Sequence, residues 1–231
     1  MRLLFIAADR MEFAGLLRHA AGARAVRLGV DWARTVRLGA HEALLAANGA
    51  GAARAGSAAV AALNAFPAEA IVSTGFCGAV DPILELAGVV VATCVAVGHR
   101  RYPALPVASP WAFQPGLVRT LDHVAQTAEE KEELRAAGAC AVEMEAAGVA
   151  VCAQAAGLPF YCIRAVTDLA GETMANDFNR ALRPDGHFDT MVVLGSLLRH
   201  PAARLPELVR LRSRCVRASR ALGDFLADCG F

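Results

Sequence analysis

The sequence lacks the side-chain patterns that hold a metal ion. Its seven cysteines form no C-x-x-C pair, and its six histidines show neither H-E-x-x-H spacing nor a cluster with cysteine. The cysteine count is odd and most of these residues lie in apolar runs, which favours buried thiols in a reducing compartment over disulfides. We therefore predict a protein that uses neither a metal nor another bound cofactor.

The chain also has little net charge and no long apolar run. A formal charge of +1 argues against a nucleic-acid partner, and no stretch approaches the ~18–20 apolar residues of a membrane span. The apolar run after Leu3 stops before Asp9, which is too short for a signal peptide, so we expect a cytoplasmic protein. With 231 residues, 56% of them hydrophobic, the chain suits one large domain.

Short apolar segments alternate with helical ones along the chain. This order predicts a single-domain, three-layer α/β fold with a central mixed, mostly parallel sheet flanked by helices. Strands are predicted over residues 3–8, 43–47, 70–80, 88–97, 117–121 and 160–167, with a loop over 99–116. Helices are predicted over residues 11–20, 52–64, 127–136, 143–156 and 205–228, with Thr127 and Glu130 as a capping box and Gly157 as a helix stop.

The C-terminal segment has a distinct pattern. Apolar side chains recur near helical spacing from Leu205 to Leu226, and six arginines from Arg204 to Arg220 provide a basic complement. We predict an α/β domain over residues 1–200 and a basic amphipathic helix over 201–231 that packs on the domain or extends it. Such a helix either leaves its arginines in water or makes peripheral contact with an anionic membrane, and both alternatives stay open.

Polar or glycine-rich residues follow several predicted strands, where open α/β sheets bind ligands. These segments are residues 9–12, 48–51, 73–78 and 164–168. Arg164 lies in an otherwise apolar strand, so it needs a carboxylate partner. Asp168 is either a turn or cap residue or part of a site. Glu143 and Glu145 are two residues apart, so one is able to pair with Arg164 while the other faces a ligand; the alternative is two solvated carboxylates in a first helical turn.

Two paired motifs resemble a known family. V-E-M-E-A (residues 142–146), followed about twenty residues later by R-A-V-T-D (residues 164–168), resembles the signature of the nucleoside phosphorylase and 5′-methylthioadenosine/S-adenosylhomocysteine nucleosidase superfamily. The G-A-G turn (residues 49–51) and S-T-G-F-C-G-A-V-D-P (residues 73–82) fit its order and spacing. The resemblance spans most of the chain and implies an enzyme that cleaves the N-glycosidic bond of a purine nucleoside.

The resemblance also implies roles for individual residues. Asp168 matches the general acid that protonates purine N7, and Glu145 matches the carboxylate that accepts hydrogen bonds from the ribose 2′- and 3′-hydroxyls. Met144 matches the residue that packs beside the sugar, and Arg164 matches the arginine that supports the site. Glu12 matches, by its position in the first βα turn, the carboxylate that activates water. The remaining residues predicted to contact substrate are Glu143, Phe76, Gly75, Val124 and Thr167.

The resemblance leaves the attacking group open between water and phosphate. Phosphorylases of the superfamily hold phosphate with arginines, and Ser73 stands at one of those positions here. A carboxylate at Glu12 repels phosphate and suits a water nucleophile, so we favour hydrolysis. The alternative is a phosphorylase with inorganic phosphate as co-substrate, held by Arg10 or Arg54.

Two departures from the family pattern leave the base open. Phe76 replaces a small hydroxyl residue, and Val124 stands where an aromatic side chain often stacks on the base. Trp111 or Phe113 are other candidates for stacking, although ordinary burial under a loop is the simpler interpretation. The same departures keep an inactive nucleoside-binding module among the alternatives. A dinucleotide-binding domain is disfavoured, because N-G-A-G lacks the full G-x-G-x-x-G pattern.

Two further segments are similar to the hopanoid-associated phosphorylase-like proteins, which are linked to removal of adenine from adenosylhopane. These segments are V-R-T-L-D-H-V-A-Q-T-A-E-E-K-E-E-L-R (residues 118–135) and L-G-S-L-L-R-H-P-A-A-R-L-P-E-L-V-R-L (residues 194–211). The similarity implies adenine as the base and a 5′-substituted or lipid-linked adenosine as the substrate. Family membership further implies a homo-oligomer, a dimer or larger.

Overall fold

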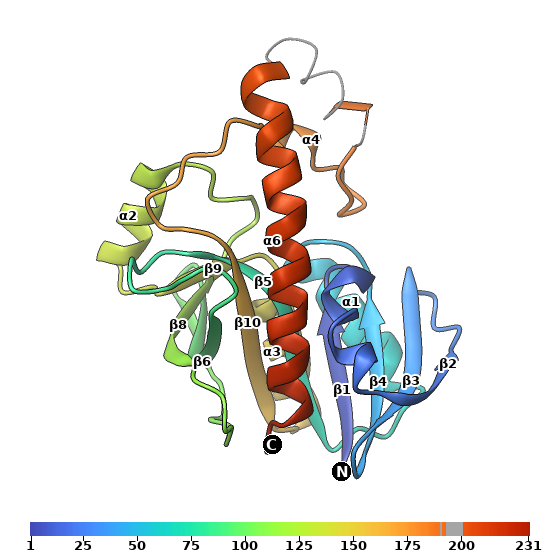
Figure 1. Cartoon of the computed structure of the whole chain (residues 1–231). Helices are drawn as coiled ribbons and strands as arrows, with labels where there is room; N and C mark the ends of the chain where they lie inside the picture. The colour runs from blue at the N-terminus through green and yellow to red at the C-terminus, as the bar shows by residue number, and fades with distance from the viewer. Residues whose placement is uncertain (190, 193–200) are drawn as a thin grey trace.

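The computed structural model describes residues 1–189, 191–192 and 201–231 of the chain. In this part of the chain, ten strands form one mixed sheet (Figure 1). The strands are β1 (Arg2–Ala7), β2 (Ala21–Ala25), β3 (Trp32–Leu38), β4 (His41–Ala47), β5 (Ala70–Ala79), β6 (Val89–Val97), β7 (Arg100–Pro103), β8 (Gln114–Thr120), β9 (Ala141–Glu143) and β10 (Phe160–Asp168).

The strand order brings three distant parts of the chain together. Neighbouring strands follow the order β10-β6-β8-β9-β5-β1-β4-β3-β2, with β7 beside β6. β10 also pairs in parallel with β5, which joins β10, β6, β8, β9 and β5 into a ring. As a result, Gly78 of β5 has Asp168 as its neighbour on one side and Val142 of β9 on the other.

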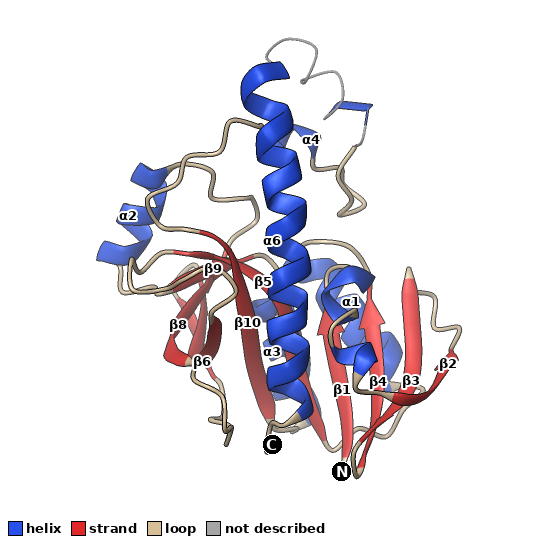
Figure 2. Ribbon diagram, viewed as in Figure 1, coloured by secondary structure: helices blue, strands red, loops and turns tan. Residues whose placement is uncertain are grey.

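Helices cover both faces of the sheet (Figure 2). Alternate residues of β1 explain how two cores form, because successive side chains of a strand point to opposite faces. Leu4 and Ile6 join a core with α1 and α3, whereas Leu3 and Phe5 join a core with α6 on the other face. The helices are η1 (Arg10–Phe13) and η2 (Leu16–Arg18), both 3₁₀, then α1 (Ala52–Leu63), α2 (Ala128–Ala136), α3 (Ala146–Ala156), α4 (Phe178–Ala181) and α6 (Pro201–Ala227).

The predicted fold class is confirmed: the domain is α/β, with a central mixed sheet flanked by helices. The sheet is less parallel than the alternation of strands and helices indicated. In the described part of the chain, parallel and antiparallel strand pairings occur in equal number. The predicted stop of α3 is confirmed, since Gly157 follows the helix with φ 64°.

The continuous helix predicted over residues 11–20 is replaced by two short 3₁₀ helices, and a serine from α6 explains why no α-helix forms. In an α-helix the amide of Gly15 would donate to the carbonyl of Met11. Here the Gly15 amide donates to Ser219 Oγ at 3.0 Å, and that hydroxyl donates to the Met11 carbonyl at 2.9 Å. The serine hydroxyl thus binds both the amide and the carbonyl that an α-helical hydrogen bond would join. Two short 3₁₀ turns form instead.

The helix predicted over residues 143–156 begins later than expected. Glu143 ends strand β9, and α3 starts at Ala146. The carboxylate of Glu143 accepts from the amides of Glu145 at 2.9 Å and Ala146 at 2.8 Å, so it binds amides that the first turn leaves free. Other missed elements are strand β3 and the edge strand β2, strand β7 inside the predicted loop, and the early start of β8.

The C-terminal helix α6 lies across one face of the sheet (Figure 1). Leu222, Phe225 and Leu226 are buried in the core that they share with β1, while Leu205 is 52% and Val209 62% exposed. The boundary predicted between residues 200 and 201 borders residues 193–200, which lie outside the described residues. None of the helices in the described part of the chain is long and apolar enough to cross a membrane.

Candidate active site

A cavity of about 400 Å³ lies beside the ends of β1, β5, β9 and β10. Eight of the ten predicted site residues line it, although they come from five separate segments of the sequence. Gly75 and Arg164 do not line the cavity but lie behind it. The eight residues are Glu12, Phe76, Val124, Glu143, Met144, Glu145, Thr167 and Asp168.

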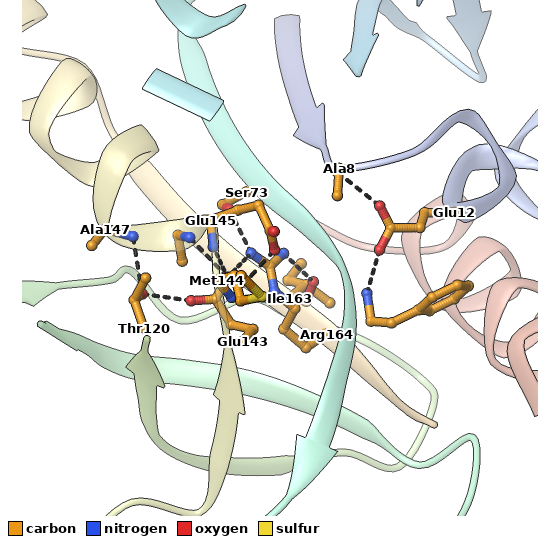
Figure 3. A network of polar contacts seen from close by, with 12 residues as sticks. Ala8, Glu12, Ser73, Thr120, Glu143, Met144, Glu145, Ala147, Ile163 and Arg164 are labelled. Carbon is orange, nitrogen blue, oxygen red and sulfur yellow. Dashed lines mark hydrogen bonds and ion pairs between the residues drawn. The ribbon is translucent and has the colours of Figure 1, made fainter. Parts of the chain in front are cut away.

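Glu12 is held by three backbone amides. Its Oε2 accepts from the amide of Ala8 at 2.8 Å (Figure 3). The same oxygen accepts from the amide of Asp9 at 2.9 Å, and Oε1 accepts from the amide of Phe76 at 2.8 Å. Burial raises the pKa of Glu12 above its ordinary value, while these hydrogen bonds act in the opposite direction. The turn after β1 and the strand β5 therefore fix one carboxylate at the cavity wall.

Gly75 makes this arrangement of Glu12 possible. Its φ of 139° lies in the region that residues with a side chain rarely adopt. A Cβ at this position would stand 2.5 Å from Oε1 of Glu12. Gly75 thus contributes space for a carboxylate rather than a contact with a ligand.

Arg164 and Glu143 form a fully enclosed ion pair. Arg164 is 0% exposed, and its Nη2 lies 2.5 Å from Oε2 of Glu143 and 2.8 Å from Oγ of Ser73 (Figure 3). Thr120 donates to the other oxygen of Glu143 at 2.5 Å. Burial alone would lower the pKa of Arg164, but the neighbouring Glu143 carboxylate raises it overall. This pair provides the carboxylate partner predicted for Arg164.

Glu145 has a different environment from Glu143. It is buried at the cavity wall, where its Oε1 accepts from the amide of Gly51 at 3.1 Å and its Oε2 accepts from the amide of Met144 at 3.4 Å. Burial and the nearby Glu143 carboxylate raise the pKa of Glu145 to about 8. Of the two glutamates in the motif, Glu145 therefore keeps more capacity to accept hydrogen bonds from a ligand.

Asp168 is buried at the cavity wall beside a lysine that the sequence analysis missed. Lys131 of α2 lies 2.6 Å from Oδ2 of Asp168, and Thr167 Oγ1 lies 3.0 Å from Oδ1. Burial raises the pKa of Asp168, and the Lys131 ammonium counteracts this effect. In the sequence Lys131 sits between glutamates, a pattern typical of a solvated helix, so no local signal indicated its burial.

The aromatic side chains at the cavity are not those proposed from the loop before β8. Trp111 and Phe113 lie elsewhere: Trp111 is half exposed and donates to Asp228, and Phe113 stacks edge-on against Phe225. The aromatic residues that line the cavity are Phe76, Phe178 and Phe188. Val124 lines it as predicted, and the side chain of Asn179 fixes its backbone through bonds of 2.7 and 2.9 Å.

The two arginines considered for phosphate do not line the cavity. Arg54 is engaged elsewhere, since its Nε donates to the carbonyl of Asn48 at 2.5 Å and its Nη2 lies 3.4 Å from Asp31. Arg10 is exposed on the turn before Glu12. In the described part of the chain, no group of three or more His, Cys, Asp or Glu side chains is arranged to hold a metal ion.

The chain matches the model of a known protein family. Residues 2–128 and 120–184 match the family model of the phosphorylase superfamily. The chain belongs to this superfamily, as the V-E-M-E-A and R-A-V-T-D motifs indicated.

Among individual relatives, the chain is similar to 5′-methylthioadenosine/S-adenosylhomocysteine nucleosidases. The protein of that name from Geobacillus thermodenitrificans is 29% identical over 194 residues, covering 71% of this chain and 82% of that protein. The one from Staphylococcus aureus is 26% identical over 159 residues, covering 56% of this chain and 70% of that protein.

Solved structures share the fold over almost the whole chain. S-adenosylhomocysteine nucleosidase from Streptococcus pyogenes, in complex with 5-methylthiotubericidin, has a TM-score of 0.75 at 22% identity, covering 99% of this chain and 95% of that chain. Futalosine hydrolase of Helicobacter pylori has a TM-score of 0.75 at 15% identity, with coverage of 99% and 97%.

Proposed function

We propose that the protein hydrolyses the N-glycosidic bond of a purine nucleoside and releases the free base. The observation that carries the proposal is one cavity whose wall holds, besides the ion-paired Glu143, the buried carboxyl groups of Glu12, Glu145 and Asp168. Membership of the phosphorylase superfamily and the similarity to nucleosidases support it. The reaction as proposed needs no cofactor, because protein side chains and water supply every group.

Asp168 is the proposed general acid. Cleavage moves the electron pair of the C1′–N9 bond onto the purine, which leaves more easily when N7 has taken a proton. A carboxylic acid performs this step only if it holds its proton near neutral pH, and burial raises the pKa of Asp168 in that direction. General acid catalysis of this kind contributes ~10²–10⁴-fold to a rate.

Glu145 and Glu12 act on the sugar in this proposal. Glu145 accepts hydrogen bonds from the ribose 2′- and 3′-hydroxyls, and Met144 packs beside the ring. As positive charge develops on the sugar, Glu12 takes a proton from water, whose oxygen then bonds to C1′. Glu143 holds Arg164 rather than substrate, since its two oxygens already accept from Thr120, Arg164 and the start of α3.

Water is favoured over phosphate as the nucleophile because of the charge around the cavity. Its described lining contains carboxylates but no arginine or lysine. A phosphate ion beside Glu12 would meet like charge, and the histidine in that lining, His123, already binds the carboxylates of Asp122 and Glu130. This argument disfavours phosphorolysis through Arg10 or Arg54.

The cavity also supports a substrate with an apolar 5′-substituent. Apolar side chains extend its lining beyond the carboxylates, and two of them remain partly open to solvent, with Met11 39% and Phe188 44% exposed. An apolar group on the nucleoside would cover these surfaces and gain roughly 25 cal/mol for each Å² removed from water. A lipid-linked adenosine, as in hopanoid synthesis, belongs to this class. Further apolar lining residues include Met174, Phe178, Leu211 and Cys215.

A product assay tests the proposal. The protein is incubated with adenosine and with adenosines carrying small or long alkyl groups at the 5′ position, with and without phosphate, and free base and sugar are measured. We expect adenine and free sugar at rates that do not depend on phosphate. Sugar 1-phosphate formed only with phosphate would establish a phosphorylase instead. Absence of base release from every nucleoside, with binding retained, would favour an inactive binding module.

A further inference from the structure

Lys131 is the charged side chain that binds Asp168, the proposed acid, and the proposed mechanism assigns it no role. Lys131 is 0% exposed, and its Nζ lies 2.6 Å from Oδ2 of Asp168 and 2.8 Å from the carbonyl of Leu169. A buried ammonium is costly unless it is paired, so its position requires a specific partner. The partner is the carboxyl group that faces the cavity.

The composition of the chain makes this lysine more notable. Lys131 is the only lysine among the 23 lysine and arginine residues of the sequence. Arginine supplies the rest of these 23 side chains, including the buried Arg164. An ammonium is a compact point charge, whereas a guanidinium is a broad planar fork. The site behind Asp168 therefore uses the compact cation that the rest of the chain does without.

We infer that Lys131 is a positioning residue for the proposed acid: it holds Oδ2 of Asp168, leaves Oδ1 for purine N7, and compensates the negative charge that appears when Oδ1 gives up its proton. The inference rests on the proposed function. In this step the Oδ1–H bond breaks, the N7–H bond forms, and the C1′–N9 electron pair passes to the purine. Lys131 keeps all its protons throughout.

Thr167 completes the arrangement at the other oxygen. A hydroxyl donates one proton and also accepts, so its role changes with that of its neighbour. Oγ1 of Thr167 lies 3.0 Å from Oδ1 of Asp168 and 3.2 Å from the carbonyl of Cys77. When Oδ1 is protonated, the hydroxyl is able to donate to Cys77 instead, and when Oδ1 is ionised it donates to Oδ1. Both states of the acid are therefore satisfied on this side.

Other charged and titratable groups near Asp168 do not replace Lys131. Glu172, in the segment after β10, acts on Asp168 by like-charge repulsion. Arg214 of α6 also interacts electrostatically with Asp168, but both of its terminal nitrogens bind Glu172, each at 2.7 Å. Two cysteine thiols complete the surroundings, Cys77 of β5 and Cys215 of α6.

Lys131→Met tests the inference through the dependence of kcat/KM on pH. Without the ammonium the pKa of Asp168 rises further, so the fall in kcat/KM at alkaline pH should move to higher pH. The maximal kcat should fall by about 10- to 100-fold, the range that a hydrogen bond to a charged group contributes. In an Asp168→Asn background the same substitution should cause little further loss of kcat, because the acid is already absent.

Arg135→Met is the matched control, because it removes one positive charge from the exposed side of the same helix. It should leave kcat and the pH profile unchanged. A merely structural role for Lys131 predicts a lower melting temperature and lower kcat with no movement of the alkaline limb, and that result would overturn the inference. If Lys131→Met does not fold, Lys131→Gln keeps a donor near Oδ2 without the charge and is measured in its place.

An NMR measurement on the lysine itself provides a second test, which needs no variant of Lys131. Because the chain has one lysine, protein labelled with ¹³Cε-lysine should give a single lysine resonance. We expect this resonance to move on Asp168→Asn and on saturation of the wild type with adenine. A resonance that stays in place in both cases would contradict the inference. Wild-type protein that releases no base but shows these shifts would instead locate the failure in the proposed function.

Discussion

Glu145→Gln should make the protein more stable and less active, and the gain in stability should depend on pH. The pKa of Glu145 is about 8 in the folded protein, against an ordinary value of 4.5. Between these values the folded state binds more protons than the unfolded state, so the stability contributed by this group falls as the pH rises from 4.5 to 8. Glutamine has the same shape but no proton to lose, so the variant escapes this penalty.

The size of the effect follows from the two pKa values. One pKa unit corresponds to about 1.4 kcal/mol, so the penalty above pH 8 is on the order of a few kcal/mol, with an upper bound of about 5 kcal/mol. Below pH 4.5 it should vanish, because both states then hold the proton. Activity should change in the opposite direction: measured above pH 8, where Glu145 carries its charge, loss of this acceptor should lower kcat/KM for ribose nucleosides by about 10- to 100-fold, and for 2′-deoxy analogues by less.

Urea unfolding of wild type and Glu145→Gln at a series of pH values between 4.5 and 8.5 measures the difference directly. Contributions from groups that do not interact with Glu145 cancel in the difference between the two curves. Glu133→Gln on the exposed side of α2 is the control and should follow wild type throughout. A Glu145→Gln variant that is equally stable at every pH, or less stable at pH 8.5, would refute the reasoning. Equal losses of activity for ribose and deoxyribose substrates would refute the role in binding the sugar.

Three further substitutions test other parts of the site. Asp168→Asn should lower kcat by ~10²–10⁴-fold, measured as base release, and a near-wild-type rate would remove Asp168 from the mechanism. Arg164→Met should lower the free energy of unfolding by about 3–5 kcal/mol, because it leaves the buried Glu143 carboxylate without its cation; a loss below about 1 kcal/mol in urea unfolding would contradict this account. Ser219→Ala should cost about 1 kcal/mol of stability for the lost hydrogen bonds and also lower kcat, because the turn that carries Glu12 is then less firmly held; unchanged kcat would show that the turn holds without the serine.

The sequence predicted the parts of the site that local patterns encode. The two motifs placed Glu145, Arg164 and Asp168, and the charge inside an apolar strand correctly required a partner for Arg164. The sequence did not reveal which glutamate that partner would be, because the choice depends on where β9 ends and α3 begins. Glu143 lies in the strand, where its carboxylate meets both Arg164 and the free amides of the helix.

Other parts depended on contacts between distant segments. Lys131 and Asp168 are 37 residues apart, and nothing in the acidic surroundings of Lys131 distinguishes it from a surface lysine until α2 packs beside the end of β10. The edge strand β2, Ala-Gly-Ala-Arg-Ala, has no alternation of apolar and polar side chains, since every residue in it is exposed. Its strand conformation follows from pairing with β3, which is a tertiary effect.

Helix α6 links the two ends of the chain at the turn that carries Glu12. Ser219 lies more than 200 residues from Met11 and Gly15, yet its hydroxyl replaces the hydrogen bond that would otherwise extend the turn into an α-helix. A regular helix here would change the backbone on both sides of Glu12, whereas the observed capping box directs its Oε2 to the amides of Ala8 and Asp9. The position of the Glu12 carboxylate therefore depends on the C-terminal helix. The same helix contributes Leu211 and Cys215 to the cavity wall. Substitutions along the buried side of α6 should consequently alter base release as well as stability, even where they do not touch the substrate.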